Sequence, residues 1–270
     1  MKKRAIILII SIILLSALLA GCGFYIHMGN GSAVIGNGKI ETKTVSVERE
    51  LTGLYNEGSI DVVIDPALDG EAVIEGESNI IDLVKLEQDA SGALAVSFKD
   101  NVSISMNRGV TVRIPAVNGG TIQLDGSGSI SLEGSSALKG DSFSVRVMGS
   151  GDIRLMTEAA EVYAIINGSG NVNLDVKTQQ LIANIEGSGD ISVKGSADRV
   201  KASINGSGNI DTLDCAASAA DVMVAGSGDI AVNVSSELTG SINGSGDVFY
   251  TGNPGTVSVS NNGSGDLIKR

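Results

Sequence analysis

Apolar and polar residues alternate along most of this chain, and a period of two predicts β-strands rather than helices. The alternation is most regular from residue 118 onward, where the tripeptide Gly-Ser-Gly recurs, followed by Asp, Asn or Ser. Its eight copies are separated by 23, 19, 19, 19, 20, 18 and 19 residues, and they begin at Gly126, Gly149, Gly168, Gly187, Gly206, Gly226, Gly244 and Gly263. Units of this length are too short for a helical hairpin or a propeller blade, so the repeat predicts an all-β fold, a β-solenoid with coils of ~19 residues.

The same residue types return at the same position of each repeat. With the first glycine as position 0, position −2 holds Leu124, Val147, Ile166, Ile185, Ile204, Val224 and Ile242, and position +4 holds Ile130, Ile153, Val172, Ile191, Ile210, Ile230, Val248 and Leu267. Even positions therefore face the interior, where these side chains would stack into aliphatic ladders. The glycines at 0 and +2 share this inward phase, which predicts that the backbone turns or approaches a neighbour closely there.

Residues 36–117 alternate less regularly, and we expect them to form an irregular N-terminal β section of the same solenoid, followed by the regular repeats at 118–270. Within this section Gly58-Ser59-Ile60-Asp61 is a degenerate copy of the repeat. Helical spacing of apolar residues predicts a short helix over 78–87, with Ser78 as its N-cap. In the regular part, the interval of 23 residues predicts a protruding loop at 133–141.

Three sequence features together resemble a known family. They are the opening Gly36-Asn37-Gly38, the stretch EGESNII that begins at Glu75, and the recurrent INGSG and GSGD units. They resemble the putative auto-transporter adhesin head GIN domain family of bacterial envelope proteins, over roughly residues 40–266. The resemblance implies a right-handed parallel β-helix and a role at the cell surface.

The N-terminus carries the pattern of an export signal. Lys2-Lys3-Arg4 is followed by a segment, 5–20, that is apolar except for two serines. This segment is short for a membrane span of about 20 residues and is typical of a secretory signal peptide. Leu19-Ala20-Gly21-Cys22 resembles the bacterial lipobox, which implies cleavage after residue 21 and acylation of Cys22. An uncleaved signal anchor is the alternative.

The resulting expectation is a lipoprotein with a signal peptide at 1–21 and a lipidated Cys22 that begins a tether at 22–35. Either alternative places the folded part outside the bacterial cytoplasmic membrane, and a Gram-negative cell could carry the lipoprotein in its outer membrane. The thirteen residues of the tether after Cys22, 23–35, would extend to at most roughly 45 Å.

Composition excludes several kinds of chemistry. The chain has a net charge of −12 and only 3% aromatic residues, so we expect no nucleic-acid partner. Removal of residues 1–21 takes away three cations and no acid, which makes the charge −15. Besides Cys22 the only cysteine is Cys215, and the only histidine is His27. These numbers leave no disulfide, no Ser-His-Asp or Cys-His arrangement and no histidine-rich zinc site, and the sequence indicates no cofactor.

The outward positions of the repeat supply the candidate binding face. Position −1 is often Asn, position +1 is Ser in all eight copies and position +3 is Asp or Asn; the candidate residues are Ser169, Ser188, Ser207, Ser227, Ser245, Asn167, Asn205, Asn243, Asp190 and Asn209. Such an array could hydrogen-bond a surface glycan or another envelope polymer. The alternative is that these residues suit a tight glycine turn and bind nothing.

A weak candidate for a Ca²⁺ site lies at Asp229, Asp247 and Asp266, three consecutive acids at position +3. Carboxylates stacked ~4.8 Å apart repel one another, and a hard cation would relieve this repulsion. The repeat is not, however, the nonapeptide of calcium-binding β-rolls.

Three functions are compatible with these features. The favoured one is a lipid-anchored adhesin or binding module without catalysis. The others are a structural or self-associating rod, and a polysaccharide-active enzyme that uses paired carboxylates, for which Asp141 and Asp152 are the first candidates. A groove lined by acids at a break in the repeat would favour the enzyme, a uniform polar face would favour binding, and exposed coil ends would favour self-association.

The lipobox predicts that replacing Cys22 blocks both processing and acylation. In Cys22→Ala, metabolic labelling with a fatty acid should disappear, and the chain should keep the mass of its uncleaved form. Labelling that persists in this variant would contradict the assignment of Cys22 as the anchor.

Overall fold

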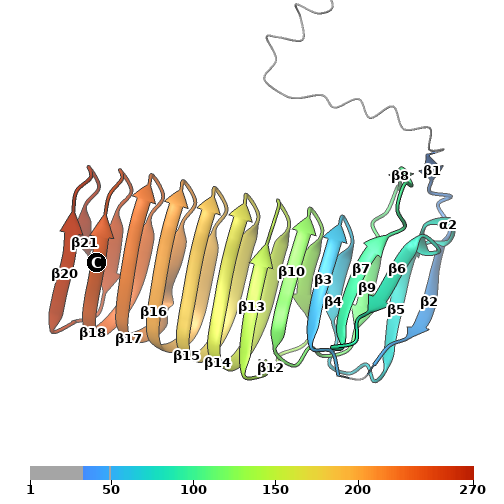
Figure 1. Cartoon of the computed structure of the whole chain (residues 1–270), viewed down its shortest axis with the longest axis horizontal. Helices are drawn as coiled ribbons and strands as arrows, with labels where there is room; N and C mark the ends of the chain where they lie inside the picture. Colours follow the sequence, from blue (N-terminus) through green and yellow to red (C-terminus); the bar gives the residue numbers. More distant parts are fainter. Residues whose placement is uncertain (1–32, 49) are drawn as a thin grey trace, which may run out of the picture. The chain divides into compact units, whose positions relative to one another are not determined.

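The protein is a parallel β-solenoid, as the repeat predicts. The computed structural model describes residues 33–48 and 50–270, and Ala33–Arg270 form one compact unit. Parallel strands lie side by side along this unit, coil after coil (Figure 1). In the part of the chain that the structure describes, the only helix is α2 (Ser78–Ile81), which has four residues. Residues 1–32, with the predicted signal peptide, Cys22 and most of the tether, lie outside the described residues.

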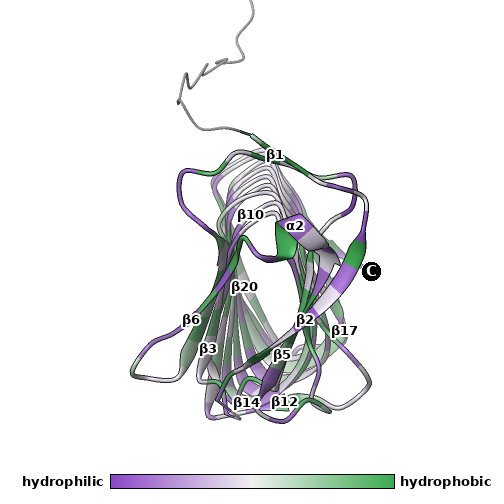
Figure 2. Ribbon diagram, turned by 90° about the vertical axis from the view of Figure 1, so that its right-hand side faces the viewer, coloured by the Kyte–Doolittle hydropathy of each residue, from purple (hydrophilic) through white to green (hydrophobic). Residues whose placement is uncertain are grey.

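Each regular coil leaves a Gly-Ser-Gly turn, runs along one side of the solenoid, bends, and returns along the other side to the next turn. The two sides converge toward the edge that carries these turns, at the top of the view along the stack (Figure 2). The strands of this part are β10 (Gly120–Gly126), β11 (Ser129–Leu132), β12 (Leu138–Lys139), β13 (Ser142–Val147), β14 (Asp152–Gly168), β15 (Asn171–Gly187), β16 (Ile191–Gly206), β17 (Ile210–Gly226), β18 (Ile230–Ile242), β19 (Val248–Thr251), β20 (Thr256–Asn261) and β21 (Leu267–Lys269).

The aliphatic ladders predicted from the sequence form the core. At position −2, Val147 pairs with Ile166, Ile166 with Ile185, and Ile185 with Ile204 in consecutive coils. Each of these side chains is at most 1% exposed. Because each ladder continues from coil to coil, one apolar cluster runs through the solenoid. A single coil could not bury these side chains by itself, so the stability of each coil depends on its neighbours.

The glycines of the repeat allow the close approach of neighbouring backbone that their inward phase predicts. A Cβ on Gly189 would lie 2.0 Å from the carbonyl oxygen of Gly170, and a Cβ on Gly187 would lie 2.1 Å from that of Gly168. Gly187 also has a φ of 144°, which side chains disfavour. The nearest obstacle is therefore the backbone of the preceding coil, and the first apolar side chain that a Cβ on Gly189 would meet is that of Ile166, at 3.1 Å.

The N-terminal section continues the coils of the regular part, and an antiparallel cap closes its other end. β3 (Gly53–Gly58) and β4 (Asp61–Ile64) pair in parallel with β10 and β11 on one side. On the other side they pair in parallel with β7 (Ala93–Phe98) and β9 (Thr111–Ile114). β5 (Glu71–Glu77) then joins β9 in antiparallel fashion, β2 (Ile40–Ser46) joins β5, and β6 (Val84–Gln88) joins β7. The short β1 (Val34–Ile35), at the end of the predicted tether, pairs with β8 (Ile104–Ser105).

Two local predictions need correction. The predicted helix 78–87 ends at Ile81, its N-cap is Glu77 rather than Ser78, and the rest of the segment forms β6. A helix this short is marginal, whereas Val84 and Leu86 alternate with polar residues and gain a ladder with β7. The predicted loop 133–141 does not protrude as a whole, because Leu138 is 3% exposed and β12 pairs with β14.

Asparagine replaces the aliphatic residue at position −2 in two coils, and in both it bridges the turn. The Asn56 amide nitrogen donates to the Ile60 carbonyl at 2.7 Å, and that of Asn261 donates to the Gly265 carbonyl at 2.6 Å. The second case lies at the C-terminal coil, where β20 and β21 each pair with one neighbour, β18 and β19 respectively. Here Arg270 stacks on the Phe249 ring, 3.9 Å from its centroid.

The contact between coils predicts a large effect from one added methyl group. Gly189→Ala should lower the free energy of unfolding by about 1–3 kcal/mol, because the backbone of two coils must move apart. Gly255→Ala is the matched control, since its Cβ would have only one neighbour within 4 Å, the Ser236 carbonyl oxygen at 3.8 Å. Urea unfolding of both variants measures the difference, and equal midpoints would contradict this role for Gly189.

Candidate functional site

One edge of the solenoid presents an uninterrupted row of serines, which we call the serine ridge. It consists of the position +1 residues Ser127, Ser150, Ser169, Ser188, Ser207, Ser227, Ser245 and Ser264, all of which are exposed. The backbone fixes their spacing, because the N–H of each serine donates to the carbonyl of a glycine in the preceding coil. For Ser188, Ser207 and Ser227 these distances are 2.9, 2.8 and 2.8 Å.

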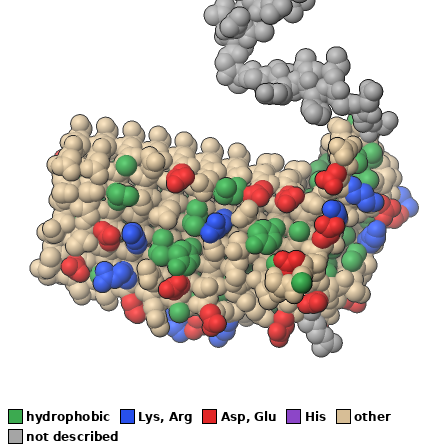
Figure 3. Space-filling model, viewed as in Figure 1, with side chains coloured by type: hydrophobic (Ala, Val, Ile, Leu, Met, Phe, Trp, Pro, Cys, Tyr) green, Lys and Arg blue, Asp and Glu red, His purple; other side chains and the backbone are tan. Residues whose placement is uncertain are grey.

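The hydroxyl groups of the ridge are available to a ligand. None of them makes a hydrogen bond to another residue within 33–48 or 50–270, although each hydroxyl can donate one and accept two. In the space-filling view the upper edge shows neither charged nor apolar side chains along its length (Figure 3). The ridge is thus a neutral, polar and convex surface with one hydroxyl group per coil.

The asparagines at position −1 flank the ridge on one side, as predicted. Asn205 and Asn243 are exposed and Asn167 is half-buried. Two of them bond to neighbours: the Asn167 amide donates to Glu186 at 2.9 Å, and that of Asn243 donates to the Ser241 hydroxyl at 3.0 Å. The side chain of Asn205 has no such bond among the described residues. This row can contribute to binding at individual coils, but it is less uniform than the serines.

The position +3 residues lie beyond the turn, where the chain descends the opposite side, and they bond to one another. The Asp190 carboxylate accepts two hydrogen bonds from Asn209, at 2.8 Å from the backbone N–H and 3.0 Å from the amide. Asp152 accepts the same pair of bonds from Asn171. We conclude that Asp190 and Asn209 have a structural role in stacking the coils, which leaves less of their hydrogen-bonding capacity for a ligand.

The three acids considered for Ca²⁺ take part in the same ladder. The Asp229 carboxylate accepts the backbone N–H of Asp247, and the Asp247 carboxylate accepts that of Asp266, each at 2.7 Å. Two of the three carboxylates therefore already have a hydrogen-bond partner in the next coil. No group of three or more His, Cys, Asp or Glu side chains within the described ranges is placed to hold a metal ion.

The residues considered for catalysis do not come together. Asp141 precedes β13 and Asp152 follows the turn after it, so a whole strand separates the two carboxylates. Cys215 is fully buried, and burial together with the charge of Asp175 raises the pKa of its thiol to about 11. It is therefore a packed core residue and not a nucleophile.

Glu77, a buried acid that the sequence analysis did not identify, stabilises the N-terminal cap through hydrogen bonds. Glu77 is 0% exposed, and its carboxylate accepts the N–H of Gly38 at 2.6 Å and that of Asn107 at 3.0 Å. Any side chain at Gly36 would overlap this carboxylate. The bonds join three segments that are far apart in the sequence, two of which, Gly36-Asn37-Gly38 and EGESNII, carry the family resemblance.

Comparison with known proteins agrees with this architecture. The model of the family described as "putative auto-transporter adhesin, head GIN domain" matches residues 50–254. The chain belongs to this family. A search of curated proteins returned no match. Across residues 33–48 and 50–270, no helix is long and apolar enough to cross a membrane.

Several solved structures share the fold. A putative adhesin from Parabacteroides merdae is 22% identical, with a TM-score of 0.81 over 89% of this chain and all of that one. A putative adhesin from Parabacteroides distasonis is 21% identical, with a TM-score of 0.79 over 88% of this chain and 100% of that one. A putative lipid-binding protein from the same species is 24% identical, with a TM-score of 0.75 and the same coverage. At these identities the likeness establishes the fold alone.

The burial of Glu77 predicts that the stability of the N-terminal cap depends on pH. Desolvation raises the pKa of this carboxyl, but hydrogen bonds from Gly38, Asn107 and Arg108 outweigh it, so the pKa lies below its ordinary value of 4.5. A lowered pKa contributes stability above the unfolded-state value, and this contribution is lost as the pH falls through the folded-state value. Glu77→Gln should therefore unfold more easily than wild type at neutral pH and lose less stability between about pH 6 and pH 3.

Chemical denaturation at a series of pH values checks this prediction. Glu75→Gln is the matched control, because Glu75 lies on the same strand and its side chain is exposed. If the stability of Glu77→Gln falls as steeply with acid as that of wild type, then another group carries the pH dependence.

Proposed function

We propose that this protein is a surface adhesin that binds an extended polar polymer, such as an envelope or host glycan, along the serine ridge, without catalysis. The observation that carries the proposal is the row of eight exposed serine hydroxyl groups, one per coil, none of which bonds to another described residue. A polymer whose repeating hydroxyl groups lie along the ridge meets an equivalent partner every ~4.8 Å.

The chemistry of the ridge favours many weak contacts over one tight pocket. A hydrogen bond exchanged with water contributes about 0.5–1.5 kcal/mol, so a single coil would bind too weakly to hold a ligand. Several coils acting together, or many molecules on one cell, multiply the effect through avidity. Membership of a family described as adhesins supports this interpretation.

A lipid on Cys22 would hold the solenoid at the membrane surface, and the segment 22–35 would separate the two. The lipobox-like Leu19-Ala20-Gly21-Cys22 supports this part of the proposal. The location that follows is the outer side of the cytoplasmic membrane, or the outer membrane in a Gram-negative cell. The net negative charge of the chain gives it no electrostatic attraction to an anionic membrane surface.

The two other functions have weaker support. A glycosidase needs a pair of carboxylates facing each other across a cleft. The groove described below holds three acids beside a break in the repeat, but Asp175 pairs with Lys194 at 3.2 Å and Asp211 accepts the N–H of Leu213 at 3.0 Å, so among the described residues only Asp214 is an acid of this groove without such a partner. A self-associating rod is favoured by the edge of β20 and β21, where Val257 is 41% and Ile268 is 36% exposed.

The proposal predicts that bulky charges on the ridge abolish adhesion without unfolding the protein. In the triple variant Ser188→Arg, Ser207→Arg and Ser227→Arg, binding of cells to immobilised glycans should fall to the level measured for cells that lack the protein. Circular dichroism and the thermal midpoint should stay unchanged, because all three side chains point into solvent.

A second triple variant controls for the added charge. Ser196→Arg, Ser218→Arg and Ser236→Arg place three arginines at exposed positions of β16, β17 and β18, away from the ridge; this variant should adhere like wild type. If the ridge variant still adheres, or if wild type adheres to no glycan, the ridge is only a turn structure. Sedimentation of the same proteins then tests the self-associating rod.

A further inference from the structure

A groove crosses the solenoid on the side that descends from the serine ridge, and the sequence alone did not reveal it. It spans β14 to β17 and has a volume of about 360 Å³. Its floor comes from Leu132, Leu155, Leu174 and Val193, and the last three are only 2–3% exposed, so the floor presents little apolar surface. The last three occupy position +6 of consecutive coils and pair in register, so the floor runs along the stack and across the strands.

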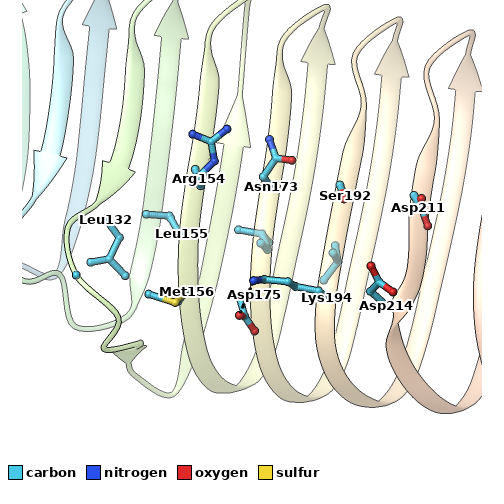
Figure 4. A pocket seen from close by; sticks show the side chains of 13 residues that line it. Leu132, Arg154, Leu155, Met156, Asn173, Asp175, Ser192, Lys194, Asp211 and Asp214 are labelled. Atoms are coloured by element: carbon cyan, nitrogen blue, oxygen red, sulfur yellow. Dashed lines mark ion pairs between the residues drawn. The ribbon is translucent and has the colours of Figure 1, made fainter.

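Two rows of side chains form the rims (Figure 4). The upper rim is the position +5 row, in the order Arg154, Asn173, Ser192, Asp211, and these residues pair with one another in register from coil to coil. The lower rim consists of Met156, Asp175, Lys194 and Asp214. A ligand that fits between the rims is therefore extended, and it lies parallel to the axis of the stack.

The two ends of the groove carry opposite charges. Arg154, at the β14 end, makes no ion pair or hydrogen bond to another described residue. The β17 end has two acids, Asp211 and Asp214, and Asp214 likewise has no such partner. Between the ends, Asp175 and Lys194 neutralise each other at 3.2 Å. The groove is thus complementary to a molecule with an anionic group at one end and a cationic group at the other.

A break in the repeat forms the acidic end. Ser192 pairs with Asp211, but Gly195 pairs with Cys215, so β17 contains one extra residue at this point. Such a β-bulge redirects the side chains beside it. It places Asp214 at the end of the lower rim, opposite the +5 row. The signal in the sequence is the 20-residue interval between Gly206 and Gly226, where the neighbouring interval upstream is 19.

The spacing of the charged ends gives the length of the ligand. Arg154 and Asp211 are three coils apart, which is roughly 14 Å at ~4.8 Å per coil. An extended peptide advances ~3.3–3.6 Å per residue, so about four residues separate a terminal carboxylate from a terminal ammonium group over this distance.

We propose that this groove binds a free oligopeptide of about four residues in an extended conformation. Its carboxylate pairs with Arg154 and its ammonium group with Asp214 and Asp211. Asn173 and Ser192, whose side chains make no hydrogen bond to other described residues, bond to the peptide groups between the ends. The flexible Met156 on the lower rim contacts an apolar side chain of the peptide.

Other ligand classes fit less well. A fatty acyl chain would pair its carboxylate with Arg154, but it would cover Asn173, Ser192 and the acidic end with methylene groups and leave them unpaired. The floor offers a glycan no aromatic ring among the residues that line the groove. Of these three classes, the peptide is the one that satisfies both charged ends and the polar middle of the rim.

Ligand-observed NMR of the full-length protein tests the proposal. The probe is an equimolar pool of tetrapeptides built from Ala, Leu, Ser and Val with free termini, beside the same pool amidated at the C-terminus, the same pool acetylated at the N-terminus, and dodecanoate. We expect saturation transfer to the free pool, and affinity weaker by about tenfold for each modified pool, since each loses one charge-assisted contact.

Variants of the charged residues test which end of the groove binds the carboxylate of the peptide and which binds its ammonium group. Arg154→Ala should bind the free and amidated pools equally, whereas the double variant Asp211→Asn and Asp214→Asn should bind the free and acetylated pools equally. Arg199→Ala and Asp198→Asn are matched controls on β16 outside the groove and should keep the preferences of wild type. The serine-ridge triple variant should also bind the free pool like wild type, because the two sites are separate.

Three results would overturn the proposal: no transfer to the free pool in wild type, equal transfer to all three pools, or transfer to dodecanoate that is lost in Arg154→Ala. The last result would identify an amphipathic lipid as the ligand. Thermal melts of each variant establish that a lost signal does not come from unfolding.

Discussion

The close approach of successive coils at the Gly-Ser-Gly turns is the constraint on which the rest of the structure depends. A carbonyl oxygen of one coil lies about where the glycine of the next would carry its Cβ, 2.0 Å away in the case of Gly189 and Gly170. Only glycine permits this contact without a shift of the backbone, and the strands on both sides of the turn pair in register around it. The aliphatic ladders and the position +3 hydrogen-bond ladder both follow from that register.

The same constraint explains why the candidate binding surface is regular. A residue between two such glycines has no room on either side, so its side chain projects outward at the edge. Serine is small and polar, and its N–H bonds to the preceding coil while its hydroxyl group stays free. The spacing of the ridge is therefore the spacing of the backbone, and a repeating polymer is the ligand class that matches it.

Breaks in the repeat, by contrast, make individual positions differ from the equivalent positions of other coils. Where the repeat is perfect, equivalent side chains stack into uniform rows and no position differs chemically from its neighbours. One additional residue in β17 ends that uniformity and gives the groove across β14 to β17 a distinct acidic end. At the N-terminus, the antiparallel cap closes the stack, and the buried Glu77 ties its segments together through bonds from Gly38 and Asn107. Specific sites thus arise where the solenoid departs from its own repeat.

The sequence by itself determined the solenoid, the length of its coils, the buried ladders and the outward serines, because each depends on a period that one repeat displays in full. The helix over 78–87 was predicted too long, since local spacing contains no information on the partner strand β7 that Val84 and Leu86 find. The tertiary structure alone decided that Asp141 and Asp152 lie a strand apart, and that Asp190 bonds to Asn209.

It also decided that Arg154 and Asp214, sixty residues apart, line one groove. A repeat specifies which residues share a row, because the coil length fixes their register. Which side chains of different rows come together depends on how the coil bends and where it bulges. Those features appear only when all coils are packed together.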